Sequence, residues 1–326
     1  NPLYMKKYSV GIDLGGTKIL LGLVERKTGE VVDFVKKKTK KEKGSENIVR
    51  KMLDGINQLL QQTQVDLSEI QSIGVGSAGQ IDRENGVIIG ALNLDCYNLD
   101  LKRILEDKFK IPTFVGNDVE VAALGEQKFG AGRGCDDFVC VFVGTGIGSA
   151  IVKGGKLIRG ATGTAGELGH IIVDLGGRAC ACGGHGCLEA YASRTAIETR
   201  IEGALKKGRK SCITEYLKDG KAITSSMIRK AIEREDELVL QCVTEASEYL
   251  SAGLASVVNL INPEQIILGG GLIEAVDYFY QSTIKKTKAK CLPVPAETIV
   301  FKKTELGDFS GVVGAAFLDK KRKGED

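Results

Sequence analysis

The sequence predicts an α/β protein built from two related lobes. Strand-type and helix-type apolar patterns follow one another along the chain, which is typical of α/β folds. A strand, a glycine turn that contains threonine, and a returning strand occur twice, around Gly15–Lys18 and around Gly144–Ser149. This weak repeat indicates two related halves. The length of 326 residues favours two domains, at about 150 residues each.

In the first half, strands are predicted on both sides of the first glycine turn. Apolar residues alternate or cluster in Tyr8–Leu14, Ile19–Val24 and Val31–Val35, as they do in strands. Ser45 can cap the next segment, a helix with apolar residues at helical spacing. These residues are Ile48, Met52, Ile56, Leu59 and Leu60.

The first half ends on a strand that delivers polar residues to its carboxyl end. Ile70–Gly76 is predicted as a buried strand that runs into Ser77-Ala78-Gly79. A helix over 101–109 must stop before Pro112, because the residue before a proline disfavours helical geometry. Thr113–Val115 then forms a strand that leads through a glycine into Asn117-Asp118.

The second half repeats the strand pattern and adds longer helices. The predicted strands are Phe138–Val143, Ala150–Val152, Gln265–Leu268 and Thr298–Phe301. The predicted helices begin at Leu188, cover Ser225–Glu235 and Glu237–Ile261, and close the chain from Gly311. The long helix ends at Asn262-Pro263, since proline cannot continue it.

Composition favours a globular protein of the reducing cytoplasm. Hydrophobic residues make up 43% of the chain, charged residues 27%, and the formal net charge is +3, so we expect neither a nucleic-acid nor a membrane partner. No apolar run has the length that a bilayer span requires. Nine cysteines, an odd number, favour free thiols over a disulfide framework. Asn1–Tyr4 precede Met5 and are interpreted as an expression scar.

The segment 165–189 has the composition of a metal loop. It holds the only two histidines of the chain, His170 and His185, and three clustered cysteines, Cys180, Cys182 and Cys187, among glycines. Three thiolates and one imidazole match the tetrahedral preference of structural zinc. The alternative is a reduced loop without metal. Composition leaves open which histidine binds.

Three glycine turns that follow strands predict a phosphate site. The turns are Gly15-Gly16-Thr17-Lys18, Gly144-Thr145-Gly146 and Gly269-Gly270-Gly271. Their N–H groups can form an anion nest, to which the Thr17 and Thr145 hydroxyls and the Lys18 ammonium add donors. Asp13 can hold Mg²⁺ directly or through water. Each turn alone is also compatible with an ordinary hairpin, and none is a Walker loop or a dinucleotide fingerprint.

Asn117-Asp118 predicts the chemistry of a kinase that acts on alcohols. Such an enzyme needs one carboxylate to accept the hydroxyl proton, here Asp118, while Asn117 can bind a substrate hydroxyl. The alternative is that the pair caps a helix over 119–129. Both roles can hold together.

These motifs, in this order, resemble the repressor, open-reading-frame, kinase (ROK) family from Lys7 to about Leu318. The most specific are Glu167-Leu168-Gly169-His170 and the block from Cys180 to Glu189. The resemblance implies an actin-like, hexokinase-like ATPase fold of two ribonuclease H-like α/β lobes with a cleft between them. We expect a smaller lobe of residues 5–118 and 308–326, and a larger lobe of 119–307 with the zinc loop.

The resemblance further implies ATP-dependent phosphorylation of a hexose, with Mg²⁺, and is closest to bacterial-type glucokinases. His170, and not His185, would complete the structural zinc site. Asp118 would be the base on the 6-hydroxyl, and the other hydroxyls would be bound by Asn117, Glu167, His170 and Glu189, with Gly79 near the sugar. Two departures are Ala78, where the family often has proline, and Val119-Glu120-Val121, where Ala-Asn-Ala is usual.

Several alternatives remain at this stage. N-acetylmannosamine, mannose or fructose could replace glucose, and polyphosphate could replace ATP. The chain could also be a sugar-sensing relative without turnover, or an actin-like ATPase that does not act on sugars. We expect no N-terminal helix-turn-helix, because Met5 lies just before the first strand. Relatives are commonly dimers or tetramers, so a homo-oligomer is expected.

Overall fold

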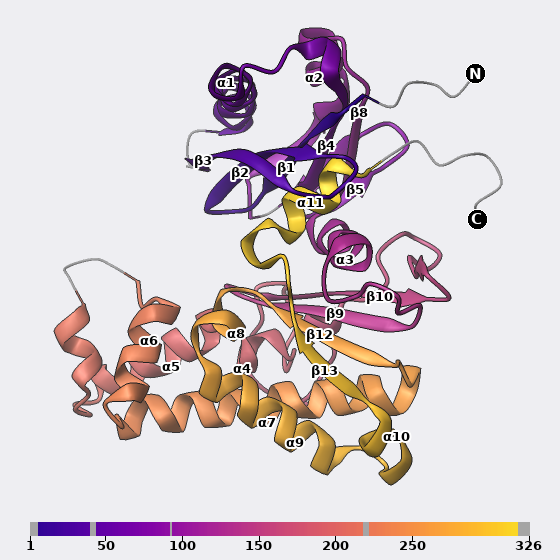
Figure 1. Ribbon diagram of the computed structural model, residues 1–326. Helices are drawn as coiled ribbons and strands as arrows, with labels where there is room; N and C mark the ends of the chain where they lie inside the picture. Colours follow the sequence, from indigo (N-terminus) through magenta and orange to yellow (C-terminus); the bar gives the residue numbers. More distant parts are fainter. Residues whose placement is uncertain (1–5, 40–43, 92, 218–221, 319–326) are drawn as a thin grey trace. The chain divides into compact units, whose positions relative to one another are not determined.

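The computed structural model describes residues 6–39, 44–91, 93–217 and 222–318, and it divides into two compact α/β units (Figure 1). Unit 1 consists of Asn1–Gly134 and Glu305–Asp326, and unit 2 of Cys135–Thr304. The predicted α/β class is confirmed. The expected expression scar and residues 319–326 lie outside the described residues.

Unit 1 is built on a five-stranded mixed sheet in the order β3-β2-β1-β4-β8. Its strands are β1 (Tyr8–Leu14), β2 (Lys18–Glu25), β3 (Val31–Lys38), β4 (Ile70–Ser77) and β8 (Thr113–Asn117). The first three strands are antiparallel neighbours, whereas β1, β4 and β8 run parallel. The helices α1 (Gly44–Thr63) and α2 (Leu101–Phe109) lie on one face, and α3 (Asp118–Phe129) and α11 (Ser310–Ala316) on the other (Figure 1).

Unit 2 repeats this topology in a sheet of the order β11-β10-β9-β12-β13. Its strands are β9 (Phe138–Val143), β10 (Ile147–Lys153), β11 (Lys156–Leu157), β12 (Gln265–Gly269) and β13 (Val300–Lys303). Again the first three are antiparallel neighbours, and β9, β12 and β13 run parallel. The two halves therefore share one strand order, as the internal repeat predicts.

Helices fill the rest of unit 2. They are α4 (Glu189–Ala192), α5 (Arg194–Lys206), α6 (Ser225–Glu233), α7 (Glu237–Ile261), α8 (Gly271–Ala275), α9 (Asp277–Lys290) and α10 (Pro293–Thr298). The predicted apolar face of α7 is buried in the core of the unit, and Asn262 ends the helix in the left-handed conformation before Pro263. None of the helices in the described ranges combines the length and the apolarity that a membrane crossing would need.

A small antiparallel sheet in unit 1 was not predicted. It consists of β5 (Gln80–Asp82), β6 (Val87–Ala91) and β7 (Cys96–Asp100), and β5 packs against β8. Four short 3₁₀ helices complete the described structure: η2 (Leu67–Glu69), η3 (Leu168–His170), η4 (Cys212–Tyr216) and η5 (Gly307–Phe309).

A row of glycines lets α11 approach the sheet of unit 1. Gly22, Gly11 and Gly74 are register partners across β2, β1 and β4. A Cβ atom on Gly11 would lie 1.9 Å from the carbonyl oxygen of Val312, and one on Gly74 would lie 1.7 Å from that of Ala315. Any side chain at these two positions would therefore push the helix away from the sheet.

The boundary of unit 1 differs from the expected one at residue 118. The helix α3 packs against α11 and β4, and Gly125 of α3 lies so close to Gly314 of α11 that the two backbones touch. Because of this packing, the first unit continues through α3 to Gly134, and the chain returns to it at Glu305 instead of residue 308.

Candidate functional site

The predicted polar residues of unit 1 lie at one edge of its sheet. The strands β1, β4 and β8 are parallel, and their ends are register partners, Leu14 with Ser77 and Ser77 with Asn117. Asp13, the turn that ends at Gly79, and Asp118 are therefore brought to the same carboxyl edge. In open α/β sheets this is the edge at which ligands bind.

Asp13 is a carboxylate with an acidic neighbourhood. Burial, the first cause, and the negative charge of Asp118 raise its pKa to about 7, while Lys18 acts in the opposite direction. The ammonium group of Lys18 forms an ion pair of 3.0 Å with Asp308, a residue that the sequence did not single out because it lies in the short η5. A carboxylate whose pKa is raised by a neighbouring carboxylate favours a bound cation, and oxygen donors suit Mg²⁺.

The first glycine turn is a tight hairpin. The N–H of Gly15 donates to the carbonyl of Lys18 at 3.0 Å, and the Gly15 carbonyl accepts from the Thr39 hydroxyl at 2.7 Å. Gly16 is half-buried and packs near Asn93, whereas Thr17 is exposed. Two hydrogen bonds within unit 1 therefore fix the backbone of the turn, and the Thr17 side chain is accessible to solvent.

Asn117 caps α3, as the alternative reading of this pair predicts. Its Oδ1 accepts from the N–H groups of Val119 and Glu120, at 3.0 and 3.2 Å, and its Nδ2 donates to the carbonyl of Gly79 at 3.4 Å. Asp118 is the first residue of the helix, and its Oδ1 accepts from the N–H of Val119 at 3.0 Å. Because Asn117 supplies the cap, Asp118 is not needed for that purpose.

The glycine turns of unit 2 lie at the matching edge of the second sheet. β9 and β12 are parallel and end together, with Gly269 opposite Phe142. Gly270 has a φ of +90°, and a Cβ there would lie 2.6 Å from the Val143 carbonyl, so only glycine fits. The Gly144–Gly146 turn is closed by a 2.9 Å bond between its ends, and Thr145 is exposed.

Glu189 connects the metal loop with this turn. It is the first residue of α4, and its Oε2 accepts from the N–H of Ile147 at 2.8 Å. A Cβ on Gly146 would lie 2.3 Å from the same oxygen, so the carboxylate lies directly on the turn.

The other side of Ile147 is covered by η3. A Cβ on Gly169 would lie 2.3 Å from the Ile147 carbonyl oxygen. The Ser149 hydroxyl donates to the carbonyl of Gly166 and accepts from the N–H of Leu168. Glu167 and His170, at the ends of this segment, are exposed.

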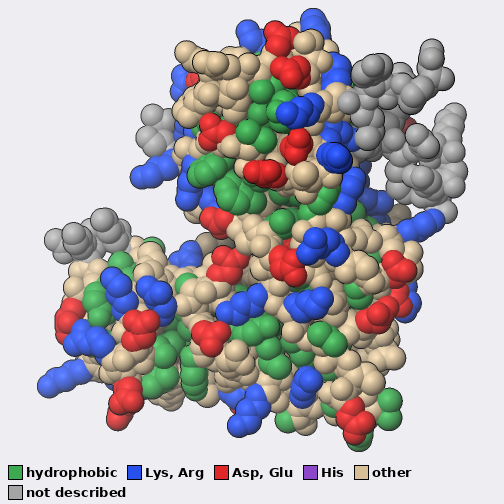
Figure 2. Space-filling model, viewed as in Figure 1, with side chains coloured by type: hydrophobic (Ala, Val, Ile, Leu, Met, Phe, Trp, Pro, Cys, Tyr) green, Lys and Arg blue, Asp and Glu red, His purple; other side chains and the backbone are tan. Residues whose placement is uncertain are grey.

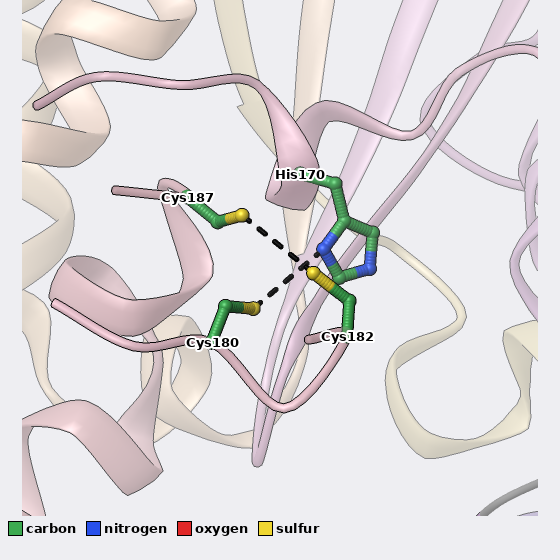
Figure 3. Close-up of side chains that lie close together, drawn as sticks. All are labelled: His170, Cys180, Cys182 and Cys187. Carbon is green, nitrogen blue, oxygen red and sulfur yellow. Dashed lines mark hydrogen bonds between the residues drawn. The ribbon is translucent and has the colours of Figure 1, made fainter. Parts of the chain in front are cut away.

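The structure brings His170 and the three cysteines into one cluster (Figure 3). One donor atom from each residue lies within 4.8 Å of all the others. The distance from Cys182 Sγ to Cys187 Sγ is 3.7 Å and that from Cys180 Sγ to His170 Nδ1 is 3.8 Å. Two sulfurs bound to one tetrahedral zinc are about 3.8 Å apart, so the donor set fits this ion.

Burial and the neighbouring thiols raise the pKa of Cys187 to about 12, so a cation that binds this thiolate has to displace its proton. His185 pairs through its backbone with Ala179 and is not among the four clustered residues.

The metal loop is held by its own polar contacts. The Tyr191 hydroxyl accepts from the N–H of Arg178 and donates to Asp174, both at 2.7 Å. The Arg178 guanidinium binds Glu245 of α7 at 2.7 Å. These bonds attach the loop to α4 and α7.

On the face in view, basic and acidic side chains of the described residues are interspersed over both units (Figure 2). Nucleic-acid binding surfaces typically carry a continuous basic stripe. The described residues on this face instead carry charges of both signs.

The comparisons with known proteins agree on one family. The sequence model of the ROK family matches residues 9–322. A glucokinase from Halalkalibacterium halodurans is 34% identical over 319 residues, which cover 97% of this chain and 96% of the relative. A xylose repressor from Caldicellulosiruptor bescii is 32% identical over 80% of this chain and 65% of its own length.

A solved structure gives the same result. The ROK family glucokinase from Streptomyces griseus, determined in complex with glucose and AMPPNP, superposes with a TM-score of 0.83 at 31% identity. The match covers 95% of this chain and 98% of that one.

Proposed function

The chain belongs to the ROK family, and on that premise we propose that it transfers the γ-phosphoryl group of ATP to the 6-hydroxyl of glucose. The observation that carries the proposal is the full-length likeness to a glucokinase solved with glucose and AMPPNP. It is supported by the likeness to the glucokinase of Halalkalibacterium halodurans over 97% of this chain.

Unit 1 supplies the general base. Asp118 accepts the proton of the 6-hydroxyl as the hydroxyl oxygen bonds to the γ-phosphorus and the bond from that phosphorus to the ADP oxygen breaks. Asn117 and Gly79 contact the sugar, and Asp13 holds Mg²⁺, which neutralises phosphate charge when bound. The Gly15–Lys18 turn offers N–H groups, the Thr17 hydroxyl and the Lys18 ammonium to phosphate oxygens.

Unit 2 supplies hydroxyl-binding groups and a second set of N–H donors. Glu167, His170 and Glu189 bind the remaining sugar hydroxyls. Gly144, Thr145 and Gly146, with Gly269, Gly270 and Gly271, bind the nucleotide. One structural zinc is bound by His170, Cys180, Cys182 and Cys187. When bound by these four residues, zinc would supply a structural link within the loop, and the proton transfer is assigned to Asp118.

The proposal includes a reducing compartment and self-association. Three of the nine cysteines must stay reduced to bind zinc, which suits the cytoplasm. We further propose that the chain forms a homodimer or homotetramer, and light scattering of the purified protein measures its mass.

A coupled assay of ADP release tests the activity. Glucose, mannose, fructose and N-acetylmannosamine are compared with ATP, and glucose again with polyphosphate. Glucose with ATP should give the highest kcat/KM, because carboxylate and amide groups that bind sugar hydroxyls stay unpaired when a hydroxyl is missing or misplaced. A higher kcat/KM for another hexose would overturn the choice of glucose as the substrate. No turnover with any hexose would favour the alternative of a sugar-sensing relative.

The role of Asp118 gives the first mutational prediction. Asp118→Asn should fold, bind glucose within a few-fold of the wild type, and lose about 10²–10⁴ in kcat, because it removes only the proton acceptor. Asp54→Asn, a change of an exposed carboxylate on α1, is the matched control and should keep full activity. Near-normal turnover of Asp118→Asn would place the base elsewhere.

A further inference from the structure

A partly buried ion pair joins α3 to the small sheet of unit 1. Glu120, in the first turn of α3, is only 7% exposed, whereas Arg83 is half-buried. The carboxylate is bound by one edge of the Arg83 guanidinium, Nη2 to Oε1 at 2.7 Å and Nε to Oε2 at 3.2 Å. A two-point pair of this kind fixes the orientation of both side chains, and a buried carboxylate is costly without it.

The two partners stand next to residues of the proposed sugar site. Glu120 lies two residues after Asp118, and its N–H donates to Asn117 Oδ1 at 3.2 Å. Arg83 follows β5, which begins directly after Gly79. Asn117 in turn donates to the carbonyl of Gly79 at 3.4 Å. The chain and these bonds form a closed ring through Gly79, Asn117, Glu120 and Arg83.

The turn at Gly79 cannot adjust independently of the small sheet. Gly79 has a φ of +100°, and a Cβ there would lie 2.4 Å from the Gly90 carbonyl of β6. The backbone of the turn therefore rests on β6, and its position relative to Asn117 depends on how the β5–β6 hairpin is held. Arg83 is the hairpin residue that binds α3 through a charged pair.

We propose that the Arg83–Glu120 pair is a positioning device for the sugar site, which fixes the Gly79 turn against Asn117 and Asp118. The inference rests on the proposed function.

The experiment removes each partner and both together. Glu120→Gln keeps the length of the side chain and Arg83→Met keeps an unbranched apolar stem, while each removes the charged pair. Arg103→Met, which breaks the exposed pair with Asp100, is the matched control. Melting temperature, glucose affinity by calorimetry, and KM for glucose and for ATP are measured for each variant.

We expect KM and Kd for glucose to rise about tenfold in either single variant, with KM for ATP at saturating glucose within about twofold of the wild type. The double variant should be no worse than the worse single one, because the two side chains act as one unit. Arg103→Met should match the wild type in all four quantities.

Two outcomes would overturn the positioning role. One is unchanged glucose affinity in folded single variants, and the other is an equal loss for both substrates, which a general loss of stability would cause. These differ from failure of the proposed function, in which the wild type and Arg103→Met themselves neither bind nor phosphorylate a hexose, and the positioning role then falls with it.

Discussion

Asp13 shows at the scale of one residue how a ligand site opposes stability. Its pKa is raised from 3.8 to about 7, so the folded protein binds a proton there that the unfolded chain does not bind between these values. Stability therefore falls as pH rises through this window. The loss of unfolding free energy that the ionised Asp13 causes is absent well below pH 3.8 and complete above about pH 7.

Asp13→Asn should accordingly stabilise the protein while it inactivates it. In the absence of Mg²⁺ and nucleotide, the free energy of unfolding should rise by about 1–4 kcal/mol at pH 8, from 1.36 kcal/mol per pKa unit, and by less at pH 4.5. Urea unfolding at both pH values measures the difference. An equal gain at both would mean that the charge of Asp13 is not its cause.

Gly146 is a second single residue whose replacement tests a neighbouring carboxylate, that of Glu189. A methyl group at this position would lie 2.3 Å from Glu189 Oε2, so Gly146→Ala should displace the carboxylate and break its bond to Ile147. We expect glucose affinity, measured by calorimetry without nucleotide, to fall about tenfold. Gly144→Ala is the control, because nothing lies within 4 Å of its Cβ. Equal affinities in the two variants would contradict the role of Glu189.

At the scale of elements, the contact of α3 with α11 depends on glycine. A Cβ on Gly314 would lie 1.7 Å from the Val121 carbonyl oxygen, and backbone cannot move aside as a side chain can. Gly314→Ala should therefore cost about 1–3 kcal/mol or more in unfolding free energy. Gly203→Ala in α5 meets open space and should instead gain about 0.4–1 kcal/mol. Thermal unfolding of both variants distinguishes the two effects, and a stable Gly314→Ala would mean that α11 can shift.

The elements differ in how well local sequence predicts them. Strands such as β1 and β9 and the helix α7 have long apolar patterns, and their predicted bounds agree with the structure within a few residues. The small sheet escaped prediction because β5 has three residues and β7 includes Asn98 at a φ of +49°. The contact of α3 with α11 joins segments about 190 residues apart in the sequence, so local sequence patterns cannot predict it.

At the scale of the whole molecule, the two units share one strand order and carry their candidate residues in the same place. In unit 1, Asp13 lies near the end of β1 and Asp118 follows β8. In unit 2, the glycine turns begin at the ends of β9 and β12. Sequence could locate these residues because parallel strands end at a common edge. It could not reveal that Glu189 binds the Gly144 turn, since that contact depends on how the metal loop folds back.

The metal loop gives the last prediction. Cys182→Ala should lose zinc, because three ligands hold the ion less tightly than four, and glucose binding should weaken at least tenfold as Glu167, His170 and Glu189 lose their common support. AMPPNP binding should weaken much less, since the Gly144–Gly146 turn keeps its own backbone bond of 2.9 Å and the bond from the Arg194 N–H to the Gly144 carbonyl.

The two histidines provide the matched pair for this test. His170→Ala should lose zinc and His185→Ala should keep it, because only His170 lies within 4.8 Å of the three thiol donors. Elemental analysis, calorimetry with glucose and AMPPNP, and hydrogen exchange over residues 144–191 measure these effects. Zinc retained in His170→Ala and lost in His185→Ala would show that the wrong imidazole is assigned. Unchanged glucose affinity in zinc-free Cys182→Ala would mean that contacts such as Arg178 with Glu245 hold the loop without the metal.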